Sequence, residues 1–298
     1  MERRKSGART ERMLITGANG LLGTEIFRSF SAEYEILRTD REECDVTISE
    51  ECRRVIGGFR PRLVVHCAAY TAVDRAEQEE EAAFALNAVG TRNVAAACRD
   101  HGALLVTFGT DYVFDGRASR PYAEGDPTGP LSAYGRSKLA AEAAIREIDP
   151  DFLLVRTQWL FGAHGRNFAL SILDRAEQGE ELKVVCDQKG SPTYTADLAD
   201  AVGRLLDAGA RGTFHFSNEG ETTFFEYAAY LLQHSGRGGT RLFPVSTADL
   251  PRDRYPAPRP LFAVLSKKKY RETTGFAPRR WEEAVSEFLD RLQPGGRA

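Results

Sequence analysis

The feature that most limits the fold of this chain is a glycine-rich segment near its start, Met13-Leu-Ile-Thr-Gly-Ala-Asn-Gly-Leu-Leu-Gly23. Its apolar beginning predicts a short strand, and glycines at G-x-x-G-x-x-G spacing predict a turn into a helix. Such a turn lets the backbone approach a pyrophosphate, which the free N–H groups and the dipole of the helix then bind. Gly17, Gly20 and Gly23 therefore indicate a dinucleotide site, with a plain strand, turn and helix as the alternative.

Length and composition narrow the class of protein. The 298 residues suffice for one large α/β unit or for two lobes. Apolar content of 42% and charged content of 28% are ordinary for a globular protein, and no apolar run is long enough to span a membrane. A net charge of -3 argues against nucleic acid or an anionic membrane as the main partner. The scattered cysteines lack a C-x-x-C pair, which favours reduced thiols and a cytoplasmic location (Cys44, Cys52, Cys67, Cys98 and Cys186).

Strands and helices alternate along most of the chain, which predicts a Rossmann-type, doubly wound parallel sheet of the α/β class. We expect strands at 13–16, 35–40, 61–69, 103–114, 151–156, 182–186 and 213–216. We expect helices at 21–30, 49–58, 77–99, 132–148, 166–178, 195–208 and 222–234, and a proline-rich loop at 251–260.

These elements suggest a division of the chain into domains. Residues 1–12 are basic and polar and lack the apolar core of a signal peptide, so we expect a disordered leader. Residues 13–160, with a return at about 195–216, form the predicted NAD(P)-binding domain. Residues 161–194 and 217–298 form a smaller α/β lobe for the substrate.

Asp40, at the end of the second predicted strand, is a candidate contact for the adenosine ribose. A carboxylate there accepts hydrogen bonds from both ribose hydroxyls and repels a 2′-phosphate, whereas the adjacent Arg41 offsets that repulsion. The choice between NADH and NADPH therefore stays open, as does a simple turn role for Asp40. We expect His66 to pack in the core rather than bind a ligand, and Asn87 to be either exposed or bonded to backbone near the active centre.

Tyr134 and Lys138 lie four residues apart in one predicted helix and hence on the same face. A nearby ammonium, helped by the charge of the nicotinamide, favours the phenolate, so we expect Lys138 to lower the pKa of Tyr134 toward neutral pH for acid–base catalysis. Thr110, at the end of the fourth predicted strand, adds a hydroxyl for the substrate oxygen. A surface Tyr/Lys pair is the alternative, but the order of glycine turn, Thr110 and Tyr–Lys helix argues against chance.

With these residues in place, the chain resembles the extended short-chain dehydrogenases/reductases and, among them, the dTDP-4-dehydrorhamnose reductase family. The matching segments extend over nearly the whole chain from Met13. They are TGANGLLG, HCAAYTAVDRAE, GTDYVFDG, YGRSK, RTQWLFG, RNF, DQKGSPTY and the final Arg259-Pro260. TAVDRAE, TDYVFDG and DQKGSPTY are specific to the family, whereas the glycine turn and YGRSK occur throughout the superfamily.

The resemblance implies roles for individual residues. The catalytic residues would be Tyr134 as proton donor, Lys138 as its partner, and Thr110. The cofactor would be held by Gly17, Gly20, Leu21, Leu22, Gly23, Asp40, Asp45, Val46, Ala68, Ala69, Tyr70, Phe108 and Lys138. The sugar nucleotide would contact Thr110, Asp111, Tyr134, Trp159, Asp74, Asn167, Gln188 and Arg259. An arginine suits a diphosphate because its guanidinium binds in bidentate fashion.

The resemblance also implies a reaction: NADPH or NADH reduces the C4 ketone of dTDP-4-dehydro-L-rhamnose to give dTDP-L-rhamnose. Two alternatives remain, a 4-ketoreductase for another dTDP-deoxysugar and a non-catalytic regulatory subunit with the same fold. The chain would be a monomer or a homodimer. No residue is assigned to a metal, although Mg²⁺ at a dimer interface stays open.

Three segments depart from the family pattern. Gly109 stands where serine is usual, which we expect to remove a hydroxyl beside the nicotinamide. The sequence after Arg259-Pro260 and the segment between Arg237 and Arg254 also differ, which leaves the sugar and base specificity open.

Overall fold

The computed structural model describes residues 11–292, which contain a six-stranded parallel sheet with the order β10-β5-β4-β3-β1-β2. The strands are β1 (Glu11–Thr16), β2 (Tyr34–Thr39), β3 (Leu63–His66), β4 (Leu104–Thr110), β5 (Phe152–Thr157) and β10 (Gly212–His215). This arrangement confirms the predicted doubly wound fold. β1 begins at Glu11, two residues before the predicted start, and the remaining ten residues of the predicted leader lie outside the described residues.

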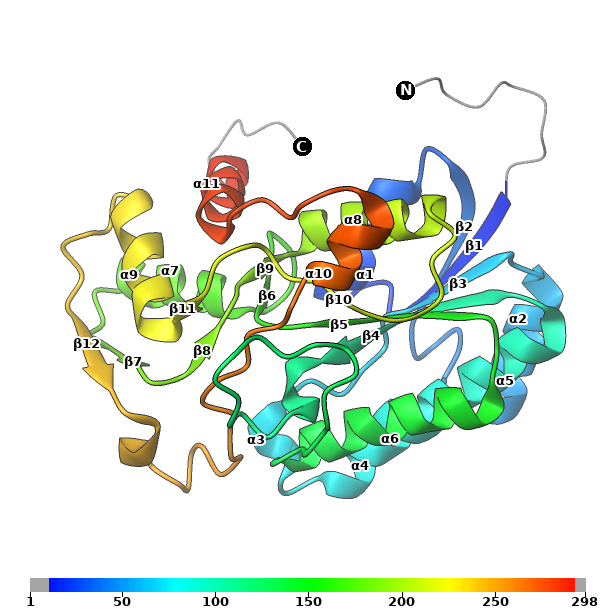
Figure 1. The fold of residues 1–298 in the computed structure, drawn as a ribbon, viewed down its shortest axis with the longest axis horizontal. Coiled ribbons are helices and arrows are strands. Elements are labelled where there is room, and N and C mark those ends of the chain that lie inside the picture. The colour runs from blue at the N-terminus through cyan, green and yellow to red at the C-terminus, as the bar shows by residue number, and fades with distance from the viewer. Residues whose placement is uncertain (1–10, 293–298) are drawn as a thin grey trace.

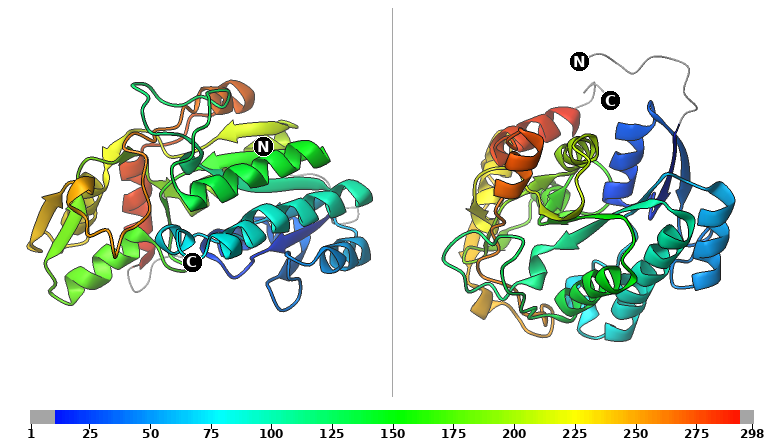
Figure 2. Two further views of the ribbon diagram at one scale, coloured as in Figure 1. Left: turned by 90° about the horizontal axis from the view of Figure 1, so that it is seen from below. Right: turned by 45° about the vertical axis from the view of Figure 1, so that its right-hand side comes forward.

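Helices cover both faces of this sheet (Figures 1 and 2). The helices α1 (Leu21–Phe30) and α8 (Thr195–Asp207) pack on one face, and α2 (Ser49–Phe59), α5 (Thr91–His101) and α6 (Ala133–Ile148) lie on the other. Since central strands of such a sheet are buried on both faces, they consist of continuous apolar residues, and all four residues of β3 are buried. His66 at its end lies between the hydroxyls of Thr16 and Thr91, at 2.7 and 3.1 Å, which confirms its place in the core.

The single helix predicted over 77–99 is wrong. The chain forms α3 (Val73–Ala76), α4 (Glu80–Phe84), a π-helix η1 (Ala85–Gly90) and then α5. A π-turn holds an extra residue, shifts the apolar stripe of the helix and occurs often at functional sites. Here it turns Asn87 into the protein, where the residue is buried.

The second lobe is built from three two-stranded sheets and the helices beside them, on the left of Figure 1. Its strands are β6 (Leu160–Phe161), β7 (Leu182–Val185), β8 (Lys189–Gly190), β9 (Thr193–Tyr194), β11 (Thr222–Thr223) and β12 (Leu242–Val245). Its helices are α7 (Phe168–Glu177), α9 (Phe224–His234), η3 (Thr247–Asp249) and α11 (Trp281–Leu292). Aromatic residues fill its core, among them Phe161, Tyr194, Tyr227 and Phe288.

One helix of the predicted substrate segment packs elsewhere. Tyr270 of α10 (Lys268–Thr274) joins the core beneath α1 and α8, and its ring meets that of Phe216 edge-on at 5.0 Å. Lys269 donates to the carbonyl of Thr213 in β10 at 2.6 Å. Residues 217–298 therefore do not all belong to the second lobe.

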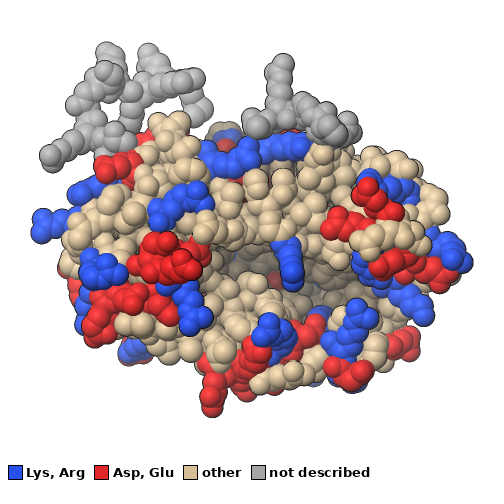
Figure 3. All heavy atoms as spheres, turned by 180° about the vertical axis from the view of Figure 1, so that it is seen from behind, with Lys and Arg blue, Asp and Glu red and all other residues tan. Residues whose placement is uncertain are grey.

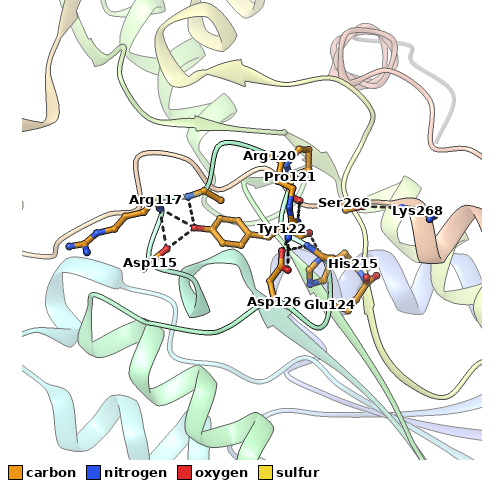
Figure 4. A network of polar contacts seen from close by, with 12 residues as sticks. Asp115, Arg117, Arg120, Pro121, Tyr122, Glu124, Asp126, His215, Ser266 and Lys268 are labelled. Carbon is orange, nitrogen blue, oxygen red and sulfur yellow. Dashed lines mark hydrogen bonds and ion pairs between the residues drawn. The ribbon is translucent and has the colours of Figure 1, made fainter.

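A long loop after β4 is bonded to the segment that precedes α10 (Figure 4). It begins with η2 (Asp111–Val113), and its residue Tyr122 stacks on Phe114 with ring centroids 4.1 Å apart. The Tyr122 phenol donates to Asp115 at 2.7 Å, and the Tyr122 backbone bonds Val264 and Ser266, both at 2.8 Å. The loop that follows Thr110 is therefore fixed to the extended segment after the proline-rich loop.

In the described range, no helix combines the length and the apolar character that crossing a membrane requires.

Candidate active site

The strand order of the sheet reverses between β1 and β3. At such a point the carboxyl ends of the parallel strands leave a crevice. A cavity of about 550 Å³ lies at this point. It is lined by Gly17, Gly20, Asp40, Arg41, Cys44, Asp45, Val46, Thr47, Cys67, Ala68, Ala69, Tyr70, Ala82, Ala85 and Leu86. Most of the residues predicted to hold the cofactor are thus brought together. The surface seen from behind is hollowed near its centre, with acidic and basic side chains intermixed around the hollow (Figure 3).

The glycines of the first turn are required by close backbone contacts. Gly17 has a φ of +65°, and a Cβ there would lie 2.5 Å from the backbone nitrogen of Ala68. A Cβ on Gly23 would overlap the carbonyl oxygen of Gly17, so this glycine allows α1 to lie close to the turn. No side chain caps α1 at Gly20, and the first N–H groups of a helix have no intrahelical partners. The turn can therefore receive a pyrophosphate.

Asp40 is positioned at the edge of the cavity. Its Oδ2 accepts a hydrogen bond from the backbone N–H of Asn19 at 2.8 Å. Arg41 beside it is 89% exposed and pairs with Asp45 at 3.3 Å. The N–H and hydroxyl of Thr47 donate to Asp45 at 2.9 and 2.6 Å, which lowers the pKa of that carboxyl. Negative and positive groups therefore stand side by side where a ribose would bind.

Tyr134 and Thr110 lie close together at the carboxyl end of β4, and Lys138 follows Tyr134 by one turn on α6. Ser132 begins α6 by accepting from the N–H of Gly135 at 3.1 Å, which places Tyr134 in the first turn and Lys138 one turn later. The Thr110 side chain lies close enough to the Tyr134 phenol to influence its pKa. None of the three lines the 550 Å³ cavity, so the chemistry would take place beyond the part that holds the adenosine.

Burial determines the pKa of Tyr134 in this structure, and the expected lowering by Lys138 together with the nicotinamide charge stays a prediction. Burial raises the pKa of Tyr134 to about 12, and the contact with Thr110 only partly opposes it. Burial also lowers the pKa of Lys138, which is 8% exposed, to about 8. Desolvation disfavours both charged forms, so the phenol keeps its proton at neutral pH. A tyrosine that gives a proton in a reduction needs this form.

Asp111 is buried beside this group. Its Oδ1 accepts from the Thr110 hydroxyl at 2.9 Å, and its Oδ2 has no partner among the described residues. Burial raises the pKa of Asp111 to about 7. The carboxyl therefore changes its charge near neutral pH, next to the Tyr134 phenol.

Asn87 follows the second of the two expectations from the sequence, because it is buried and bonded to backbone. Its Oδ1 accepts from the N–H of Tyr70 at 2.8 Å, and its Nδ2 donates to the carbonyl of Tyr70 at 3.1 Å and to Ser137 at 2.9 Å. Ser137 immediately precedes Lys138, so one buried amide connects the cofactor loop to the catalytic helix. A polar residue in the middle of an apolar helical pattern was the available signal.

Gly109 lies against a buried ion pair. A Cβ there would lie 2.7 Å from Cγ of Arg156 and 3.0 Å from Oε1 of Glu142. Arg156 and Glu142 are both buried and form a bidentate ion pair at 2.8 and 2.7 Å. Gly109 therefore makes room for a buried arginine, and the expected loss of a hydroxyl beside the nicotinamide stays a prediction.

Trp159 follows β5 in a left-handed conformation with a φ of +47°. Its ring stacks on Phe224 with centroids 3.7 Å apart, and a Cβ on Gly190 would lie 2.6 Å from Cε2 of the indole. The indole is thus packed against residues of the second lobe, and its contact with the sugar stays a prediction.

The outer residues of the predicted substrate set are engaged within the chain. Asn167 caps α7 by accepting from the N–H of Leu170 at 3.1 Å. Gln188 donates to Thr247 at 2.9 Å, and Arg259 pairs with Asp74 at 2.5 Å. Of the predicted cofactor residues, Leu22 and Phe108 lie in the core that α1 and α8 cover. A ligand contact for these side chains stays a prediction.

Within residues 11–292, no three His, Cys, Asp or Glu side chains gather closely enough to hold a metal ion. The structure therefore gives no support to the Mg²⁺ ion considered from the sequence.

Comparison with known proteins agrees with this geometry. A probable dTDP-4,6-dihydroxy-2-methyloxan-3-one 4-ketoreductase from Streptomyces antibioticus is 42% identical, over 93% of this chain and 94% of that protein. A dTDP-4-dehydrorhamnose reductase from Mycobacterium tuberculosis is 40% identical, over 94% of this chain and 93% of that protein. The solved structure of a dTDP-4-dehydrorhamnose reductase from Bacillus anthracis in complex with NADP matches with a TM-score of 0.89 and 37% identity, over 94% and 99% of the two chains. The family described as "RmlD substrate binding domain" matches residues 11–294, and the chain therefore belongs to the RmlD family.

Proposed function

We propose that this chain reduces the C4 ketone of dTDP-4-dehydro-L-rhamnose to dTDP-L-rhamnose with NADPH or NADH. The observation that carries the proposal is the closeness of Tyr134 and Thr110 at the end of β4, with Lys138 one turn along α6, beside a cavity shaped for a dinucleotide. The names of the Mycobacterium tuberculosis and Bacillus anthracis relatives support the substrate.

The residues around the glycine turn fit a nicotinamide dinucleotide, because side chains are excluded where the pyrophosphate would lie. When bound, that cofactor supplies the hydride for C4. Asp40 would accept from the adenosine ribose hydroxyls, and Lys138 would donate to the nicotinamide ribose. Arg41 offers a cation near the position of a 2′-phosphate, which supports the use of NADPH as well as NADH.

The protein's own part in the reaction is to hold the ketone and protonate its oxygen. Thr110 would donate a hydrogen bond to the C4 oxygen and orient the carbonyl. As the new C–H bond forms, the Tyr134 O–H bond breaks and its proton goes to that oxygen. A phenol that is un-ionised at neutral pH is ready for this step, and Lys138 stabilises the phenolate that results. Asp111 and Trp159 would contact the sugar ring.

A second candidate is the reduction of a 4-keto group on another dTDP-deoxysugar. The Streptomyces antibioticus relative, at 42% identity, specifically favours it. A non-catalytic regulatory role is less well supported, because the residues needed for catalysis are all present. Thr110 lies close to Tyr134, and Tyr134 and Lys138 share one face of α6. We further propose a cytoplasmic location, which the free cysteines favour.

The test is turnover by the purified protein on two substrates, dTDP-4-dehydro-L-rhamnose and dTDP-4-dehydro-6-deoxy-D-glucose, each with NADPH and with NADH. Nicotinamide oxidation gives the rate, and NMR of the product gives the configuration at C4. The proposal expects the rhamnose derivative to react with the higher kcat/KM. Preference for the glucose derivative would select the second candidate, and cofactor binding without turnover on either would favour the regulatory role.

A further inference from the structure

The proline-rich loop is fastened to the first domain by one carboxylate. Arg259 donates to Oδ2 of Asp74 at 2.5 Å, and the N–H of Ala257 donates to Oδ1 at 3.3 Å. Arg259 also donates to the carbonyl of Ala257 at 2.9 Å, which closes the loop around the Asp74 side chain. Asp74 lies in α3, just after the cofactor loop that follows β3. Two segments far apart in sequence are therefore joined beside the cofactor cavity.

Arg259 continues this connection toward the catalytic tyrosine. Its guanidinium lies close enough to the Tyr112 side chain for each group to influence the pKa of the other. The Tyr112 ring meets the Tyr134 ring edge-on, with centroids 5.4 Å apart and planes at 76°. Such edge-to-face contacts fix the relative orientation of two rings. The side chains of Asp74, Arg259, Tyr112 and Tyr134 thus form a continuous series, which we call the Asp74 brace.

The exposure of the ion pair shows that the brace is more than a surface contact. The Arg259 and Asp74 side chains are 16% and 28% exposed, so water screens their attraction only in part. Both terminal nitrogens of Arg259 already have partners, Asp74 and the carbonyl of Ala257. Arg259 has further N–H groups for a second acceptor, but Asp74 already compensates its charge.

We propose that Asp74 is a positioning residue for Tyr134: through Arg259 it holds the proline-rich loop closed and keeps Tyr112 packed against the catalytic ring. The inference rests on the proposed reduction at Tyr134 and deepens it. It replaces direct recognition of the diphosphate by Asp74 and Arg259 with control of the geometry at the site of proton transfer.

A double-mutant cycle tests the brace. The variants are Asp74→Asn, Arg259→Gln and the combination, with Arg120→Gln as the matched control. Arg120 makes an ion pair with Asp126 at 2.8 Å in the loop after β4 and contacts neither Tyr112 nor the proline-rich loop in the interactions described. kcat and KM for the sugar nucleotide are measured, together with the Kd of NADPH and the rate of trypsin cleavage after Arg252 and Arg254, which are exposed.

The brace predicts that each single variant lowers kcat about tenfold and leaves the Kd of NADPH unchanged. The kcat of the double variant should equal that of the less active single variant. Trypsin should cut all three variants faster than the wild type and the control. The brace would be overturned if Arg259→Gln raised KM for the sugar nucleotide while Asp74→Asn left KM unchanged or lowered it. That result would assign Arg259 to the diphosphate. Additive losses would also overturn it.

Failure of the proposed function gives a different result. If the wild type turns over neither sugar nucleotide, the reaction is refuted, and the trypsin rates then decide the brace. Equal acceleration in the two single variants and their combination supports it, and cleavage at the wild-type rate refutes it.

Discussion

Replacing Asp111 by Asn removes a charge that the fold buries without full compensation. Asp111 is 2% exposed, and one of its carboxylate oxygens has no partner in the described part of the chain. Burial raises its pKa from 3.8 to about 7. Between about pH 4 and pH 7 the carboxyl therefore keeps its proton in the folded protein, whereas it has lost the proton in the unfolded chain. Stability therefore falls as the pH rises through this window, and the full cost is present above about pH 7.

The size of the effect follows from the shift. Each pKa unit corresponds to about 1.4 kcal/mol, so a shift of roughly three units gives an upper limit of about 4 kcal/mol. An Asn retains an acceptor for the Thr110 hydroxyl but has no charge to bury. Its amide remains unpartnered at every pH, as the protonated carboxyl does at low pH, so this cost is largely independent of pH. We therefore compare the free energy of unfolding of Asp111→Asn with that of the wild type at two pH values. We expect this difference to be about 2–4 kcal/mol more favourable to the variant at pH 8 than at pH 4.

Urea unfolding of both proteins at several pH values between 4 and 8 measures this difference. The same variant should lose kcat/KM for the sugar nucleotide, because Asp111 is proposed to contact the sugar. A stability difference that does not change between pH 4 and pH 8 would refute the assignment of a buried, titrating carboxyl.

Three further variants test other parts of the account. Asp40→Ala should weaken NADH more than NADPH, because only NADH has both adenosine ribose hydroxyls free; equal losses of affinity by fluorescence titration would show that Asp40 does not bind the ribose. Gly109→Ser should lower the free energy of unfolding by about 1–3 kcal/mol while leaving the Kd of NADPH unchanged, because the added Cβ presses on Arg156; a stability equal to that of the wild type would contradict this packing. Asn87→Ala should lower kcat by releasing the loop at Tyr70 from α6, and unchanged steady-state kinetics would refute its positioning role.

The fold could be predicted because its local signals agree with one another. The glycine turn, the apolar strands and the intervening amphipathic helices each indicate a doubly wound sheet, and the structure contains it. Tyr134, Lys138 and Thr110 could be identified because their roles require particular residue types at particular points of such a sheet. The closeness of Gly17 and Gly23 to neighbouring backbone follows from the same motif.

The remaining features depend on contacts that a pattern does not contain. The π-helix at 85–90 depends on tertiary packing, and only there does Asn87 reach both Tyr70 and Ser137. The direction of the Tyr134 pKa shift depends on burial, which a sequence pattern does not contain. The pair of Asp74 and Arg259 joins segments whose separation in sequence gives no local signal.

The most direct test of the central claim is a single-turnover comparison of the wild type with Tyr134→Phe. Each protein is loaded with NADPH, its Kd is measured, and dTDP-4-dehydro-L-rhamnose is then mixed in while nicotinamide oxidation is followed. The account predicts equal NADPH affinity and a reduction rate about 10²- to 10⁴-fold lower in the variant, because only the proton donor has been removed. A variant that reduces the sugar within a few-fold of the wild-type rate would contradict the assignment of Tyr134 as the proton donor.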